Sequence, residues 1–195
     1  MKAIVIFIGV VLFVFILGVG ANNNITSKEE VVFKELSNLE SCLQRRYDLI
    51  PNLVSTVKGY ATHEQKTLEA VVNARSKVGG VTLNPSQLSD PNAMKSYAAH
   101  HGELQGALHR LLVVAESYPQ LKANEGFMDL QHQLEGTENR INYARTQFNE
   151  SVRSFNSTIR SFPASVINSM FTHLDKKCGF QADEKAKENV VVNFD

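Results

Sequence analysis

One carboxylate and one histidine stand three residues apart in the second half of the chain, at Asp129 and His132. On a helix this spacing puts both side chains on one face, and helical bundles use it to bind pairs of metal ions. Such a site also needs a second pair of this kind and two further carboxylates, and the sequence contains only this one pair. A solvent-exposed pair therefore explains the two residues better than a metal site. A metal-dependent enzyme that uses Asp129, His132 and histidines of the preceding helix is kept as the alternative function.

The remaining histidines form no recognisable catalytic arrangement. His63 lies in the stretch HEQKT, which lacks the second histidine of a zinc-protease helix motif. His101 shares a helical stripe with Leu104 and Leu108, where a histidine is usually a hydrogen-bonded core residue. The chain has no glycine-rich phosphate loop and no G-x-S-x-G motif. The sequence therefore predicts no enzyme, no bound metal and no cofactor.

Three asparagines repeat every seven residues, at Asn142, Asn149 and Asn156, beside an apolar series of the same period. This period places them in one narrow stripe along a helix. Isolated amides slightly disfavour a helix, so three in one register need a reason. Two interpretations stay open: a solvated flank, or a recognition face for a partner helix or a second copy of the chain.

A proline interrupts a long helical pattern in the stretch RRYDLIPNLV, whose candidate binding residues are Arg45, Arg46, Tyr47, Asp48 and Pro51. Apolar residues keep one seven-residue phase on both sides of the proline. Asp48 could cap a new helix there, or one helix could continue through a kink. We expect the kinked helix, because a loop would usually shift the phase. The proline then leaves the Tyr47 carbonyl without its helical donor, where a partner or water can bind.

The apolar periodicity predicts an all-α fold, in which an elongated antiparallel bundle of three long helices and a short fourth helix follows a transmembrane helix. Gly79 and Gly80 are expected to end the first long helix, whereas Asp90 and Asn124 are expected to cap the next two. The predicted helices cover residues 30–78, 91–117, 124–161 and 164–174.

Four charged residues, Glu64, Arg75, Glu138 and Arg145, fall on apolar stripes of the first and third long helices. If the second helix doubles back, the third runs parallel to the first, and these side chains meet in one layer. We expect a compensated network that fixes the register of the two helices, because buried charges persist only when paired. The alternative is that the long side chains reach water at the edge of the bundle.

The amino-terminal residues Ala3 to Ala21 include no charged or amide side chain. As a helix they span roughly 28 Å, close to the hydrocarbon thickness of a bilayer. The alternative is a cleaved signal peptide, but the apolar core of such a peptide is usually only about 7 to 15 residues long. We therefore expect an uncleaved anchor.

The flanking charges, Lys2 on one side and Lys28 and Lys34 on the other, are too few to fix the orientation of the anchor. A short basic start followed by an apolar run ordinarily leaves the amino terminus in the cytoplasm. We accordingly expect a single-pass protein of the cell's inner membrane, with the body on the extracytoplasmic side.

The charge balance argues against nucleic acid as a partner. The chain has 20 basic and 20 acidic side chains and a formal net charge of zero, so no long-range field attracts a polyanion. The two cysteines, Cys42 and Cys178, are too few for a disulfide scaffold and are not spaced as metal ligands.

Several long stretches of the chain carry a resemblance to a known family. They begin with RRYDLIPNLVSTVKGYATHEQKTLEAVVNARSKV and include LSDP, YPQLKANEGFMDLQHQLEGTENRINYARTQFNESVRSFN, SFP and the tail GFQADEKAKENVVVNF. These stretches resemble the LemA family of bacterial proteins. The resemblance implies a single-pass membrane protein with a long helical bundle, from a family without an established enzymatic activity. Some relatives are associated with forming membrane-bounded compartments. Upstream the chain differs, because KEEVVFKELSNLESCLQ stands where the family usually has a tryptophan-containing segment.

The predicted organisation is a membrane anchor at 1–24, a helical bundle at 25–174 and a charged tail at 175–195. The predicted function is a membrane-anchored scaffold or protein-interaction module without catalysis. Its expected partners are the membrane, other membrane or envelope proteins and a second copy of the chain.

Overall fold

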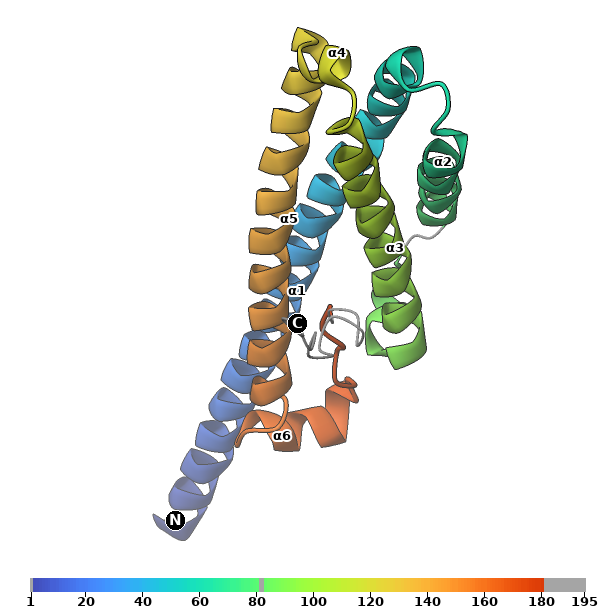
Figure 1. The fold of residues 1–195 in the computed structure, drawn as a ribbon. Helices are drawn as coiled ribbons and strands as arrows, with labels where there is room; N and C mark the ends of the chain where they lie inside the picture. The colour runs from blue at the N-terminus through green and yellow to red at the C-terminus, as the bar shows by residue number, and fades with distance from the viewer. Residues whose placement is uncertain (1, 81–82, 181–195) are drawn as a thin grey trace, which may run out of the picture.

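The computed structural model describes residues 2–80 and 83–180, and within these ranges it contains helices and no strand (Figure 1). This confirms the all-α prediction of an apolar amino-terminal helix followed by a helical body. The elements are α1 Lys2–Tyr60, α2 Gln65–Gly79, the 3₁₀ helix η1 Pro85–Ser89, α3 Pro91–Ala115, α4 Pro119–Lys122, α5 Glu125–Thr158, α6 Ala164–Ile167 and the π-helical turn η2 Asn168–Thr172.

Helix α1 joins the apolar segment to the body without a break. Its 59 residues continue through Pro51, as the sequence predicted. The large apolar side chains described between Ile4 and Val19 are 43–69% exposed, and this part of the helix is long and apolar enough to cross a membrane. Beyond Ala21 the same helix has a buried stripe that runs up the centre of the body. One rod therefore carries both the candidate membrane span and the main packing surface.

The predicted helix over residues 30–78 is wrong in one respect, because it ends at Tyr60 and resumes at Gln65. Residues 61–64 form a turn, in which the Glu64 amide donates to the Ala61 carbonyl. These four residues replace about one helical turn of 3.6 residues, so the apolar phase is almost unchanged. The apolar periodicity therefore gave no sign of this turn. After it, α2 folds back and lies beside α3 (Figure 1).

This extra reversal changes the direction of α5, which runs antiparallel to α1 and not parallel to it as predicted. Asn124 Nδ2 donates to Tyr60 Oη near one end, and Arg46 pairs with Glu138 further along. The partner's number on α5 rises as the number on α1 falls, as antiparallel helices require. Figure 1 shows α5 descending beside α1 along most of its length.

The predicted caps of α3 and α5 are present. The Asp90 carboxylate accepts from the Asn92 amide at 2.8 Å, with Pro91 in the first helical position. The Asn124 side-chain oxygen accepts from the Phe127 amide at 2.9 Å. Both bonds satisfy donors that a helix start leaves free, and they fix where the two helices begin.

Two separate hydrophobic clusters fill the body. The one nearer the membrane span joins α1 up to Leu43 with α5 from Ile141, and includes Tyr97 at the start of α3. The other joins α1 from Ile50 with α2, the second half of α3 and α5 up to Leu134. On each of three helices the clusters are thus seven residues, or about two turns, apart. The stretch between them holds the buried polar residues Arg46, His101 and Thr137.

Candidate functional site

The first candidate site is the polar layer between the two clusters, centred on Arg46. Its side chain is only 2% exposed. Nη1 donates to Glu138 Oε1 of α5 at 3.1 Å, and Nη2 lies 3.1 Å from His101 Nδ1 of α3. A charge-assisted bond to a carboxylate and one to a neutral imidazole compensate much of the desolvation of the guanidinium. Arg46 therefore ties α1, α3 and α5 together at one level.

His101 is the buried, hydrogen-bonded core residue that its stripe predicted. Burial, and next the neighbouring Arg46 charge, lower the pKa of His101 from 6.5 to about 3. The imidazole is therefore neutral near pH 7, so Nδ1 can accept from Arg46. The Tyr97 ring packs edge-on against it, with centroids 4.5 Å apart, and burial raises the pKa of Tyr97.

A groove of about 570 Å³ opens beside this layer, between α1, the end of α2 and α3. Glu40, Tyr47, Tyr97 and His101 are among its lining residues. Burial raises the pKa of the Glu40 carboxyl. The groove thus combines a carboxyl group with aromatic walls, a chemistry that can receive a small polar or cationic group.

The sequence predicted that the Tyr47 carbonyl would lack its helical donor, and another residue of the chain donates to it instead. Arg75 Nε donates to it at 3.3 Å, and the Arg75 guanidinium lies 3.8 Å from the centre of the Tyr47 ring. The end of α2 fits the same ring, because a Cβ atom on Gly79 would lie 2.8 Å from Tyr47 Oη. Tyr47 is therefore the contact that α1 makes with the end of α2, whose main packing partner is α3.

The other residues of the RRYD stretch lie on the outside of α1. Arg45 donates to Gln133 Oε1 of α5 at 2.9 Å, and Asp48 accepts from Gln44 one turn earlier. Asp48 is thus no helix cap, and Pro51 is exposed. The stretch has an inner half that packs the bundle and an outer half open to solvent.

The predicted four-residue charge layer does not form, because the antiparallel direction of α5 separates its members. Glu64 accepts from the Tyr118 hydroxyl at 3.0 Å, and Arg145 donates to Asn142 on its own helix. Arg75 lies on Tyr47, whereas Glu138 pairs with Arg46. One charge pair does join α1 and α5, but it is Arg46 with Glu138 and not the predicted network.

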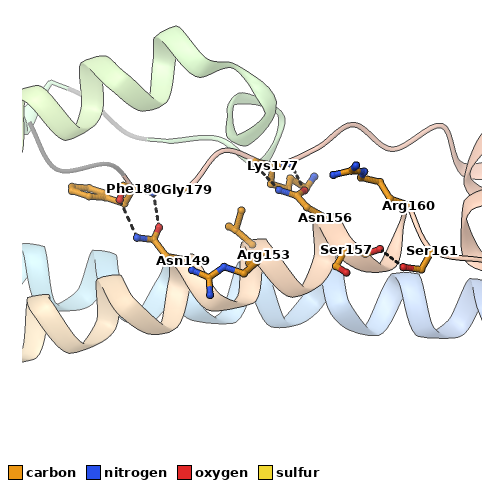
Figure 2. A pocket seen from close by; sticks show the side chains of 10 residues that line it. Asn149, Arg153, Asn156, Ser157, Arg160, Ser161, Lys177, Gly179 and Phe180 are labelled. Carbon is orange, nitrogen blue, oxygen red and sulfur yellow. Dashed lines mark hydrogen bonds between the residues drawn. The ribbon is translucent and has the colours of Figure 1, made fainter. Parts of the chain in front are cut away.

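The asparagine stripe of α5 forms the second candidate site, and the chain's own tail lies on it (Figure 2). The Asn156 side chain accepts from the Lys177 amide at 2.9 Å and donates to the Lys177 carbonyl at 2.8 Å. Asn149 holds the Phe180 amide at 2.7 Å and the Phe180 carbonyl at 3.0 Å in the same way. Asn142, the third member, is exposed and accepts from Arg145.

The spacing of this asparagine clamp, Asn149 and Asn156, matches an extended peptide. Seven helical residues rise about 10.5 Å, and three extended residues span about 10 Å. The two asparagines therefore meet tail residues that are three positions apart, Lys177 and Phe180. Each asparagine side chain bonds only the backbone of its tail residue. Between these two tail residues, Gly179 leaves no room for a side chain, since a Cβ atom there would lie 2.8 Å from Asn149 Oδ1.

A groove of about 710 Å³ runs along the clamp, and Arg153 and Arg160 stand on its rim (Figure 2). Both arginines are exposed, and Arg153 pairs with Glu150 on its own helix. Because both clamp amides already bond the backbone of residues 177 and 180, the open part of the groove is bordered by these two arginines.

Comparison with known proteins shows which family has this sequence. The model of the LemA family matches residues 35–194 of the chain. The chain belongs to the LemA family. The match includes both candidate sites and begins after the apolar segment.

A curated relative of this LemA-family chain is the magnetosome protein MamQ of Magnetospirillum gryphiswaldense (strain DSM 6361 / JCM 21280 / NBRC 15271 / MSR-1). The two are 28% identical over 149 residues, which cover 67% of this chain and 53% of MamQ. The chain thus spans about half the length of the curated relative that it matches.

Neither the LemA resemblance nor the sequence pattern predicted a role for Lys177, a buried residue of the tail. Its Nζ lies 2.7 Å from Glu29 Oε1 and 5.4 Å from the centres of the Phe33 and Phe155 rings. A lysine in a charged tail reads as solvated, so composition conceals this contact. The sequence held one hint of the tail's position: seven residues of a helix and three residues of an extended chain have almost the same length.

The proposed metal ligands do not come together. Asp129 and His132 are both exposed on α5. Within residues 2–80 and 83–180, no group of three His, Cys, Asp or Glu side chains is arranged to hold a metal ion.

Proposed function

We propose that this LemA-family chain is a membrane-anchored helical scaffold that presents its bundle to other proteins and has no catalytic activity. One observation carries the proposal: α1 is a single helix whose first part is exposed and apolar and whose second part is the central helix of the body. A continuous helix transmits position and direction from the membrane to the bundle, as a rigid support must.

The internal chemistry supports the same role. The Arg46 guanidinium hydrogen-bonds side chains of α3 and α5. Arg75 donates to the one backbone carbonyl of α1 that Pro51 leaves without a helical donor. These residues hold helices in register. The surface left for partners is the outer face of the bundle, including the exposed Tyr143 and Asn142 of α5.

Site-specific photo-crosslinking in native membranes tests the scaffold. A photoreactive residue is placed at exposed positions on three helices, Val72, Val113 and Tyr143. The scaffold predicts adducts of defined mass with a second copy or with another membrane or envelope protein, from one face and not from the others. Failure of every position to yield a protein adduct would contradict the scaffold.

We further propose that the span lies in the inner membrane and that the bundle faces away from the cytoplasm. Protease added to intact spheroplasts should then digest the bundle, whereas protection until the membrane is broken would place it in the cytoplasm. Elemental analysis of the purified chain tests the absence of catalysis by a metal, since stoichiometric iron, zinc or manganese would favour the enzyme.

A further inference from the structure

The segment after α5 forms a foot, residues 162–172, that turns away from the bundle axis. It contains α6 and the π-helical turn η2. Figure 1 shows α6 crossing the lower end of α5 beside α1 and not continuing along it. The foot is therefore oriented crosswise to the helix that carries the candidate span.

One face of the foot is apolar and uncovered. The exposed fractions are 82% for Phe162, 44% for Val166, 64% for Met170 and 70% for Phe171. On the body the large exposed apolar side chains stand singly, as at Val113 and Tyr143. Large apolar side chains gathered on one short segment mark a surface that something else covers.

The opposite face of the foot is packed on the bundle. Ala164 is buried in the cluster nearer the span, and Ile167 and Leu174 pack against that cluster. Asn168 closes the end of the turn, because its side-chain oxygen accepts from the Leu174 amide at 2.8 Å and from the Thr172 hydroxyl at 2.7 Å. The uncovered face is therefore held in a fixed direction.

The level at which the foot meets α1 indicates what covers its apolar face. A Cβ atom on Gly18 would lie 3.6 Å from Ile167 Cδ1. A groove of about 880 Å³ is lined by Leu17, Gly20 and Ala21 on one side and by Phe162, Pro163 and Ala164 on the other. The foot thus meets α1 where the apolar segment gives way to three asparagines, residues 22–24.

That level is the membrane surface if the apolar segment spans the bilayer. A span of about 20 residues fills the roughly 30 Å hydrocarbon core, so the helix leaves it near Ala21. A short amphipathic segment at this depth lies in the interface with its apolar face about 5–10 Å deep among the lipids. Because α1 links span and foot directly, the foot meets the leaflet on the body's side whichever way the chain is oriented.

We propose that the foot is a second membrane contact, which inserts Phe162, Val166, Met170 and Phe171 into the lipid interface beside the span. Together with α1 it fixes the tilt of the bundle relative to the bilayer. Arg160 and Lys176, both exposed and close to the foot in sequence, supply positive charge for anionic headgroups. The inference rests on the proposed membrane anchoring of α1.

Depth-dependent tryptophan quenching tests the inference, because the chain contains no tryptophan. The full chain is reconstituted in phosphatidylcholine and phosphatidylglycerol vesicles that carry bromine either near the headgroups or deep in the acyl chains. Three single-tryptophan variants are compared: Phe171→Trp in the foot, Phe13→Trp in the span and Tyr143→Trp on α5. Phe13 lies eight residues before Ala21, so it should sit about 12 Å below the membrane surface, near the centre of the bilayer.

The Phe171→Trp variant is expected to lose emission mainly with shallow bromines, the Phe13→Trp variant mainly with deep bromines, and the Tyr143→Trp variant with neither. Quenching of Phe13→Trp together with unquenched Phe171→Trp overturns the foot as a lipid contact and leaves the anchor intact. Coverage by a second copy would give that same pattern, with a blue-shifted Phe171→Trp emission. No quenching of Phe13→Trp would overturn the anchor and the foot together.

Discussion

Arg75 completes the hydrogen bonding of a helix to which it does not belong: its Nε donates to the Tyr47 carbonyl at 3.3 Å. In a regular helix the residue four positions later would donate to this carbonyl, and that residue is Pro51. The proline in α1 and the fold-back of α2 are therefore parts of one arrangement. The stacking of Arg75 on the Tyr47 ring, at 3.8 Å, strengthens the contact.

A double-mutant cycle measures this dependence. Arg75→Met should lower the free energy of unfolding by about 1–2 kcal/mol, because the partly buried Tyr47 carbonyl loses its donor. In a Pro51→Ala background the loss should be smaller, since the new amide bonds the Tyr47 carbonyl. Unfolding of the full chain in detergent, followed by circular dichroism, gives the four values. Lys66→Met, an exposed change on α2, is the control, and equal losses in both backgrounds would refute the coupling.

The second prediction concerns the fit of Gly79 against Tyr47. Gly79→Ala should destabilise the chain by about 1 kcal/mol, because the new methyl group displaces the Tyr47 hydroxyl. Tyr47→Phe should relieve this loss, since it removes the atom that Cβ would meet at 2.8 Å. Gly80→Ala, where a Cβ meets nothing closer than 3.9 Å, is the matched control in thermal denaturation. Equal melting temperatures for the Gly79 and Gly80 variants would show that the ring has room.

The helical class, the caps and the continuation through Pro51 could be predicted from sequence because each depends on neighbouring residues. The turn at residues 61–64 could not, since it adds almost a whole helical turn and leaves the periodicity intact. That one missed turn reversed the predicted direction of α5. The predicted layer of Glu64, Arg75, Glu138 and Arg145 failed for this reason.

A third prediction follows from His101, whose pKa is lowered to about 3 from 6.5. In the folded chain the imidazole resists protonation, whereas in the unfolded chain it takes up a proton near pH 6.5. Its contribution to stability is therefore complete above about pH 6.5 and is lost as the pH falls toward 3, by up to about 1.4 kcal/mol per pH unit.

Unfolding free energies measured from pH 7 to pH 4 check this. His101→Asn keeps an acceptor for Arg46 without a titrating ring, so it should flatten the acid side of the profile. His132→Asn, a change at an exposed histidine, should leave the profile as in the wild type. An unaltered acid slope in His101→Asn would mean that another group governs the acid response.

The fourth prediction concerns the asparagine clamp. Asn149→Leu and Asn156→Leu each remove an acceptor from one tail amide, of Phe180 and Lys177 respectively. Hydrogen exchange of that amide should accelerate at least about tenfold, as expected for one hydrogen bond of about 1.4 kcal/mol. Asn142→Leu should change neither amide. Unchanged exchange in both clamp variants would show that packing alone holds the tail.

The seven-residue asparagine repeat could be recognised in the sequence, but not its occupant. Both sequence interpretations placed water, a partner helix or a second copy on the stripe, and Asn149 and Asn156 instead hold residues 177 and 180 of the same chain. The contact joins residues 21 and 31 positions apart. Local patterns carry no information on such pairings. Binding of a partner at the stripe stays a prediction.

Arg45 and Arg46 provide the most direct test of the bundle as a self-supporting scaffold. They are neighbours of the same residue type, and only the Arg46 side chain points into the bundle. Arg46 is buried against Glu138 and His101, and Arg45 is exposed and bonds Gln133. The decisive measurement is the free energy of unfolding of Arg46→Met beside Arg45→Met in the full chain. Arg46→Met should cost roughly 3 kcal/mol, because Glu138 and His101 lose their partner, and Arg45→Met should cost less than about 0.5 kcal/mol. An Arg46→Met chain as stable as the wild type would contradict this account and would point to an arginine kept for a ligand.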